Sequence, residues 1–221
     1  MNRPVSAQSG NILLYILIAI VLIGLITVAL RSNGGMTENV DKESDASKAT
    51  QLIRYAGELS QAVQIILSNG ASEADVRFAI PGSVTAGYGD IATTPANQVF
   101  SSQGGKAVYR LPPAGVNDGT AWAFSAGRSM PQVGSDKADL TAILTNVTDS
   151  SCQAIDSQLG FSSVPTAACG TVTSGFLGAS DYSSSPIILS TAGFSLLPAP
   201  QACIKCTSPS RNLYIVTLIA R

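Results

Sequence analysis

Residues 49–67 read ATQLIRYAGELSQAVQIIL and carry the clearest structural signal in the chain. Their apolar side chains recur at steps of three and four residues, the period of one face of an α-helix. The members of this stripe are Ala49, Leu52, Ile53, Ala56, Leu59, Val63, Ile66 and Leu67. The charged residues fall mostly off the stripe, and Asn69-Gly70 follows it as a stop signal. We therefore predict an amphipathic helix from about Thr37 to Ser68, within a segment of residues 32–70.

A run of apolar residues precedes this helix. Residues 12–30 read ILLYILIAIVLIGLITVAL, which is 19 residues without a charge. As a helix they would extend about 28 Å, close to the ~30 Å thickness of a bilayer's hydrocarbon core. We expect a transmembrane helix over residues 11–31, followed by a flexible break at Ser32–Gly35. A cleaved secretory signal is the main alternative, but its apolar part would be ~7–15 residues and would end in an A-x-A-like site.

The composition changes after Gly70, where Gly, Ser, Thr and Pro become frequent and apolar runs become short. This pattern predicts an extracytoplasmic, β-rich domain over residues 71–221. Residues 149–159 are expected to form a short helix, with Asp149 or Ser150 as its cap and Gly160 as its stop. The last segment, NLYIVTLIA, is apolar on both alternating faces, which suits a strand covered on both sides. Strands are predicted at residues 107–111, 121–124, 140–147, 186–189 and 212–220.

The chain contains four cysteines, Cys152, Cys169, Cys203 and Cys206, which allow three pairings. Their separations favour Cys152–Cys169 and Cys203–Cys206, and crossed pairings remain open. Cys203 and Cys206 also form a C-x-x-C motif, but prolines surround it, so we place it in a loop before the last strand. A structural disulfide is favoured there over a redox couple, which would need a helix N-terminus, or a zinc site, which would need a second such motif.

The cysteines also indicate a compartment. Basic residues flank the apolar run on both sides, so the positive-inside rule does not set its orientation. All four cysteines lie downstream of the run, and stable disulfides need an oxidising environment. We expect the N-terminus in the cytoplasm and the following domain outside it.

Several functional classes are disfavoured by composition. The chain has no histidine, which removes Ser-His-Asp and Cys-His catalysis and His-dependent metal sites. After Met36, 11 basic and 14 acidic residues give a net charge of −3, unlike a nucleic-acid-binding surface. Oxygen ligands could bind calcium, but turn residues exposed to solvent are the preferred interpretation of Asp90, Asp118, Asp136 and Asp139. Trp122 is expected in the core. We therefore predict no enzyme, cofactor or metal site.

The first thirty residues resemble a type IV prepilin. MNRPVSAQSG corresponds to the leader, residues 1–10, and NILLYILIAIVLIGLITVAL to the apolar stem that follows without a spacer. The resemblance implies that a prepilin peptidase cuts after Gly10 and leaves Asn11 as the mature N-terminus. Most pilins begin with Phe or another apolar residue, where this chain has Asn11, and most have Glu at the fifth mature position, where this chain has Tyr15. These departures indicate a minor rather than a major subunit.

Together these features predict an α+β fold, with a long N-terminal transmembrane plus amphipathic helix followed by an antiparallel sheet with disulfide-pinned loops. The expected function is that of a minor pilin-like subunit of a type IV pilus or a type II secretion pseudopilus. Its expected location is the bacterial inner membrane, as a single-pass protein, or an extracellular filament. Its partners would be other pilin-like subunits, the assembly platform and the prepilin peptidase, and not nucleic acid. The alternatives are a signal-anchored periplasmic binding domain and, third, a periplasmic thiol-redox protein.

Overall fold

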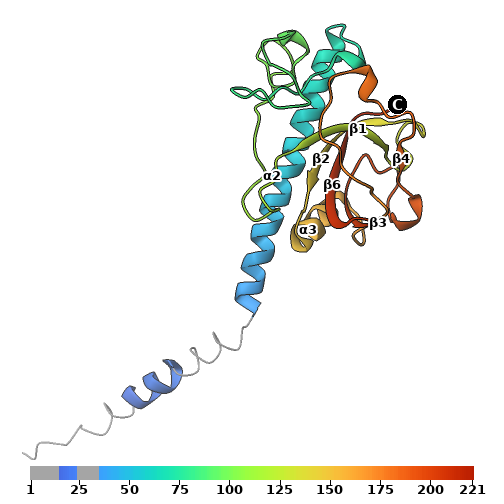
Figure 1. Cartoon of the computed structure of the whole chain (residues 1–221). Helices are drawn as coiled ribbons and strands as arrows, with labels where there is room; N and C mark the ends of the chain where they lie inside the picture. The colour runs from blue at the N-terminus through green and yellow to red at the C-terminus, as the bar shows by residue number, and fades with distance from the viewer. Residues whose placement is uncertain (1–14, 24–34) are drawn as a thin grey trace, which may run out of the picture. The chain divides into compact units, whose positions relative to one another are not determined.

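The computed structural model describes residues 15–23 and 35–221, with side-chain surroundings for residues 15–23 and 41–221 (Figure 1). The chain divides into two compact units, Met1–Glu43 and Ser44–Arg221. The second unit is built on a curled, mixed sheet with helices α2 (Gly35–Ser68) and α3 (Asp149–Leu159). Short 3-10 turns occur at Glu73–Asp75, Pro95–Asn97, Ala179–Asp181 and Thr191–Gly193.

The N-terminal helix that the structure describes is shorter than the predicted one. It covers Tyr15 to Ile23, nine residues, or about 14 Å of rise, whereas the hydrocarbon core of a bilayer is ~30 Å thick. Within residues 15–23 and 35–221, no helix is both long enough and apolar enough to cross a membrane. The predicted long transmembrane helix is therefore wrong as a description of this fold. The predicted cleavage site at Gly10 and Asn11 lies outside the described residues. So do residues 32–34 of the predicted flexible break.

Helix α2 begins two residues before the predicted start at Thr37 and ends at the predicted Ser68. Six residues of the apolar stripe are at most 1% exposed, and Tyr55 and Ala62 widen the buried face. The buried members of the stripe are Ala49, Leu52, Ala56, Leu59, Val63 and Ile66. From residue 49 onward, α2 therefore buries one face against the sheet and leaves Gln51, Arg54 and Gln61 exposed.

The sheet has six strands in the order β3-β5-β6-β2-β1-β4. The strands are β1 (Ala123–Ser129), β2 (Asp139–Thr145), β3 (Thr166–Ala167), β4 (Ile187–Ile188), β5 (Gln201–Thr207) and β6 (Ser210–Ile219). The four central strands pair antiparallel, whereas the short edge strands β3 and β4 pair in parallel with β5 and β1. The predicted purely antiparallel sheet is therefore wrong. Parallel neighbours need long crossover connections, and the connections over residues 168–200 and 130–186 provide them.

Both faces of the central strands are buried. On one face, Tyr214 and Val216 of β6 join the core formed with α2 and α3. On the other face, Leu213 and Ile215 pack against a second core, whose members from the loops of residues 161–199 include Phe161, Leu189 and Phe194. This arrangement confirms the prediction of a last strand covered on both sides, and it explains why NLYIVTLIA has no polar face.

The segment between α2 and β1 has no strand at residues 107–111, so that prediction is wrong. Its backbone is bonded to α2 instead, because the amide of Val108 donates to Glu58 Oε1 and the amide of Arg110 donates to Tyr55 Oη, both at 3.1 Å. Upstream, Phe78 stacks on Phe124 of β1 with ring centroids 4.1 Å apart. Side-chain contacts therefore hold this segment where a strand ladder was expected.

The buried face of α2 gives a stability prediction. Leu59→Ala removes a side chain that is 0% exposed, and it should lower the free energy of unfolding by about 2–5 kcal/mol. The exposed Gln61→Ala, two residues later, is the control and should change it by less than about 0.5 kcal/mol. Urea denaturation followed by circular dichroism measures both values. Equal effects of the two substitutions would contradict the packing described here.

Candidate functional site

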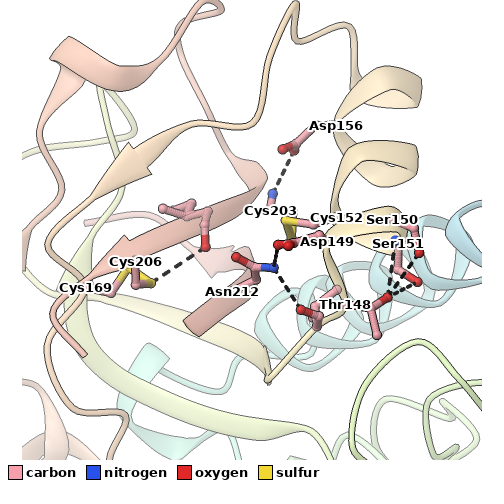
Figure 2. Close-up of a disulfide and its surroundings, with 12 residues drawn as sticks. Thr148, Asp149, Ser150, Ser151, Cys152, Asp156, Cys169, Cys203, Cys206 and Asn212 are labelled. Carbon is pink, nitrogen blue, oxygen red and sulfur yellow. Dashed lines mark hydrogen bonds between the residues drawn. A yellow bond between two sulfur atoms is a disulfide. The ribbon is translucent and has the colours of Figure 1, made fainter. Parts of the chain in front are cut away.

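Two disulfides cross-link the end of the sheet next to α3 (Figure 2). Cys152 of α3 is bonded to Cys203 of β5, and Cys169, just after β3, is bonded to Cys206 of β5. All four predicted cysteines are therefore paired, but the favoured pairing is wrong. The crossed arrangement joins two different covering segments to the same strand.

The conformation of the C-x-x-C motif explains this pairing. Cys203 and Cys206 lie within strand β5, not in the predicted loop, and β5 continues through a two-residue connection into β6. Successive side chains of a strand point to opposite faces, so residues three apart also face opposite ways. Cys203 accordingly lies in the core under α2 and α3, and Cys206 lies in the second core. In this strand the two sulfurs cannot meet each other.

The surroundings of the disulfides indicate what they can do chemically. Each of the four cysteines is at most 2% exposed, and the described residues include no free cysteine. Thiol–disulfide exchange requires an attacking thiolate to reach a sulfur, which this burial prevents. The Cys152–Cys203 bond closes a separation of 51 residues, for which the chain-entropy model gives about 4 kcal/mol of stabilisation. The two disulfides, Cys152–Cys203 and Cys169–Cys206, therefore act as structural cross-links, and together they are called the disulfide brace.

Helix α3 is fixed at its start by side-chain hydrogen bonds (Figure 2). Thr148, not the predicted Asp149 or Ser150, is the N-cap, and its hydroxyl accepts from the amide of Ser151 at 3.3 Å. Asp149 is engaged elsewhere, because its Oδ1 accepts from Asn212 Nδ2 of β6 at 2.7 Å. Gly160 ends the helix in a left-handed conformation, with φ of 90°, as predicted. These hydrogen bonds therefore fix the orientation of the helix that carries Cys152 and its disulfide to Cys203.

Asp156 is a buried carboxyl one helical turn after Cys152. Its Oδ1 accepts a hydrogen bond from the amide of Cys203 at 2.8 Å, while its Oδ2 is buried with no partner (Figure 2). The side chain is 2% exposed, and this burial raises the pKa of Asp156 to about 7. Sequence analysis missed this residue. The signal that could have revealed it is its position four residues after Cys152, on the same face of the helix.

A groove of about 560 Å³ lies between α2 and the segment around Arg110. Arg110 forms an ion pair with Glu58 at 3.2 Å, and its guanidinium lies 5.6 Å from the centre of the Tyr55 ring. Trp122 closes the inner side of this groove, and it is 3% exposed, as expected of a core residue. Its indole Nε1 is buried without a hydrogen-bond partner. The groove contains charges and aromatic rings suited to contact with another molecule.

The aspartates considered for calcium do not come together. Asp139 is fully buried in β2, where its two oxygens accept from the amides of Met130 and Arg221. Asp118 accepts from Thr120 and Asn146, and Asp90 accepts from the amide of Ala92. Across the part of the chain that the structure describes, no three acidic or cysteine side chains are grouped as a metal ion would require.

Asp156 gives a prediction about pH. The pKa of Asp156 is about 7 in the folded protein and about 3.9 in an unfolded chain. The carboxyl therefore ionises more readily in the unfolded chain, and the free energy of unfolding falls as the pH rises from about 4 to 7. Asp156→Asn removes the titration and keeps an oxygen for the Cys203 amide. The variant should therefore be more stable than the parent at pH 8, with the advantage shrinking towards pH 4.

Urea midpoints at pH 4, 6 and 8 test this prediction. Asp136→Asn, at an exposed loop position, is the control for the change in net charge. A constant difference between Asp156→Asn and the parent at all three pH values would show that burial of this carboxyl does not govern the pH dependence.

Comparisons with protein families, with characterised proteins and with solved structures give no match for this chain. The resemblance to prepilins therefore depends on the first thirty residues alone, and the function is inferred from those residues together with the geometry of the described units.

Proposed function

We propose that the chain is a minor structural subunit of a pilin-like filament, either a type IV pilus or a type II secretion pseudopilus. The observation that supports this proposal best is the surface of the N-terminal helix. Seven of its large apolar side chains, from Tyr15 to Leu22, are 47–65% exposed. They are Tyr15, Ile16, Leu17, Ile18, Ile20, Val21 and Leu22.

A helix that is apolar on all sides needs an apolar environment. Apolar surface is transferred from water at about 25 cal/mol per Å², so leaving these side chains in water is costly. In the proposed function, the apolar side chains of this segment contact lipid at the inner membrane before assembly and the equivalent segments of other pilin-like subunits afterwards. The assembly platform would move the subunit between these environments.

The second unit supports a position outside the cytoplasm. Residues 44–221 contain both disulfides, and stable disulfides form in oxidising compartments such as the periplasm or the extracellular space. The brace between α3 and β5 would stabilise a domain exposed to that environment. With the sulfurs buried and Cys203 and Cys206 bonded to different partners, the geometry favours a structural role over the thiol-redox alternative.

The residue at position 15 supports a minor role in the filament. Where most pilins have Glu, this chain has Tyr15, a residue that is 65% exposed and has no carboxylate. A carboxylate in an apolar bundle is tolerated when it is paired, and in pilins the partner is thought to be a neighbour's N-terminal amine. A subunit with Tyr15 gives that amine no carboxylate with which to form an ion pair. It would therefore join or cap a filament that other subunits build.

The alternative is an envelope domain held by an uncleaved signal segment, and processing of the N-terminus separates the two proposals. In cells with a prepilin peptidase, the mature protein should begin at Asn11, as measured by mass spectrometry. Gly10→Val should leave the leader in place, because a bulky residue blocks the cut, whereas the neighbouring Ser9→Ala should be processed normally. An intact Met1, or a cut beyond Leu30, would rule out prepilin-type maturation.

Assembly tests the minor role. Expressed as the sole pilin-like protein alongside the assembly machinery, the chain should yield no fibres in electron micrographs. It should enter fibres when the system's major subunit is also present, which serves as the control for a working machinery. Tyr15→Phe should behave like the parent, since the proposal assigns no role to the hydroxyl. Long fibres made of this chain alone would refute a minor role.

A further inference from the structure

A second cavity, of about 330 Å³, lies at the β1–β4 edge of the sheet. It is distinct from the α2 groove and from the disulfide brace. Its lining is hydrophilic, with five hydroxyl groups, one carboxylate and one guanidinium. These groups belong to Ser125, Arg128, Thr171, Thr173, Asp181, Ser183 and Ser185. The proposed filament function does not use this cavity.

A β-bulge in β1 places the guanidinium of Arg128 in the cavity lining. Ser125 pairs with Thr141, but Arg128 pairs with Asp139, so β1 has one residue more than β2 over this stretch. An extra residue reverses the alternation of the side chains that follow it. Without the bulge, Arg128 would face α2. With it, Arg128 lies on the opposite face of the sheet and forms part of the cavity lining.

Arg128 is a buried cation without an anion. It is 1% exposed, its Nε and Nη2 donate to the carbonyl of Cys169, and Nη2 also donates to the carbonyl of Thr171. Its Nη1 has no hydrogen-bond partner among the described residues, and no carboxylate there forms an ion pair with it. Burial, and then the nearby charge of Arg211, lower the pKa of Arg128 to about 10, so it stays protonated at neutral pH. A buried charge of this kind is costly unless it is paired.

The hydroxyl groups provide a second observation that points to a ligand. Ser125 is 5% exposed and lines the cavity, yet its Oγ forms no hydrogen bond with the described residues. This oxygen is not one of the side-chain atoms that are fully buried without a partner, so it can be reached from the cavity. Asp181 accepts the amide of Leu177 through Oδ2 and has a second oxygen available. The cavity therefore offers donors and acceptors that the protein itself does not satisfy.

We propose that this cavity binds a monosaccharide unit that carries one carboxylate, such as a hexuronic acid. The ligand carboxylate would accept from Nη1 of Arg128, and its hydroxyls would bond to Ser125, Asp181 and the other hydroxyl groups of the lining. The one cation in the lining, Arg128, suits a ligand with a single carboxylate, and Asp181 suits the hydroxyl-bearing side of the sugar, because its free oxygen can accept from a hydroxyl. The volume is at the lower end of small-molecule sites, which suits one sugar ring.

Gly127 allows the cavity to be filled without changing Arg128. A Cβ added to Gly127 would meet only Ser125 Oγ, at 3.6 Å, and its φ lies outside the left-handed region. Gly127→Val should therefore fold, since Val suits a strand, and its methyl groups should occupy the ligand's space. Gly57→Ala, in the α2 groove, is the control for a glycine substitution outside this cavity, because a Cβ added there meets no atom within 4 Å. Arg128→Gln removes the cation itself.

The test is calorimetric titration of the purified full chain with glucuronic acid, glucose, acetate and inorganic phosphate. Glucuronic acid should bind at least tenfold more tightly than the other three, and Gly57→Ala should match the parent. Gly127→Val and Arg128→Gln should each lose at least tenfold in affinity for glucuronic acid, with circular dichroism reporting their folding.

Three results would overturn the proposal. The first is no binding of glucuronic acid by the parent. The second is binding of glucose, acetate or phosphate as tight as that of glucuronic acid, which would mean that the cavity does not require a carboxylate and hydroxyls together. The third is unchanged binding by a folded Gly127→Val variant, which would place the ligand elsewhere. Should Arg128→Gln fail to fold, Gly127→Val alone decides between these outcomes.

Discussion

The central strands must be covered on both faces, and only one face is covered by helices. Tyr214 and Val216 are shielded by α2 and α3, whose own backbones are satisfied internally. The opposite face is shielded by residues 161–199, which have little regular structure and few backbone bonds of their own. Strand β5 links the two layers, because Cys203 ties it to α3 and Cys206 ties it to the loop layer. The rest of the structure depends on this double attachment, which bonds the irregular cover to the same strand as the helical one.

The sequence predicted those parts of the fold whose signal is local. The stripe of α2, the stop at Gly160 and the two-sided apolar pattern of β6 each lie within a short window, and local periodicity is what sequence inspection detects. Segments decided by distant partners were misjudged. Residues 107–111 alternate like a strand, but Glu58 and Tyr55 bind their amides. The prolines around the C-x-x-C motif suggested a loop, although Pro209 belongs to the connection between β5 and β6 and leaves both strands intact. The favoured pairing of the cysteines rested on their separations in sequence, whereas the sheet joins each covering segment to β5.

The candidate sites were still harder to predict. Asp156 and Arg128 are charged residues that sequence patterns place at the surface, and both are buried because of tertiary structure. Asp156 faces β5 since it lies one turn after a cysteine that is bonded to that strand. Arg128 faces the loop layer because β1 contains one extra residue. A single sequence shows neither the disulfide partner of Cys152 nor the bulge in β1. The burial of Asp156 and of Arg128 could therefore not be predicted from it.

The position of β6 in the sheet has a consequence for biogenesis. Although β6 follows every other strand in the chain, it lies between β5 and β2 at the centre of the sheet. A chain threaded through a translocation channel from its N-terminus would release Cys152 and Cys169 first. Strand β6, which pairs with the strand that carries Cys203 and Cys206, would then still be inside the channel. Those two thiols are the nearest neighbours available for oxidation at that moment, and joining them gives a pairing that the finished sheet does not allow. Formation of long-range strand pairs is slow, and disulfide reshuffling takes seconds to hours. In the proposed function, export of this chain would therefore require a compartment that isomerises disulfides as well as one that forms them.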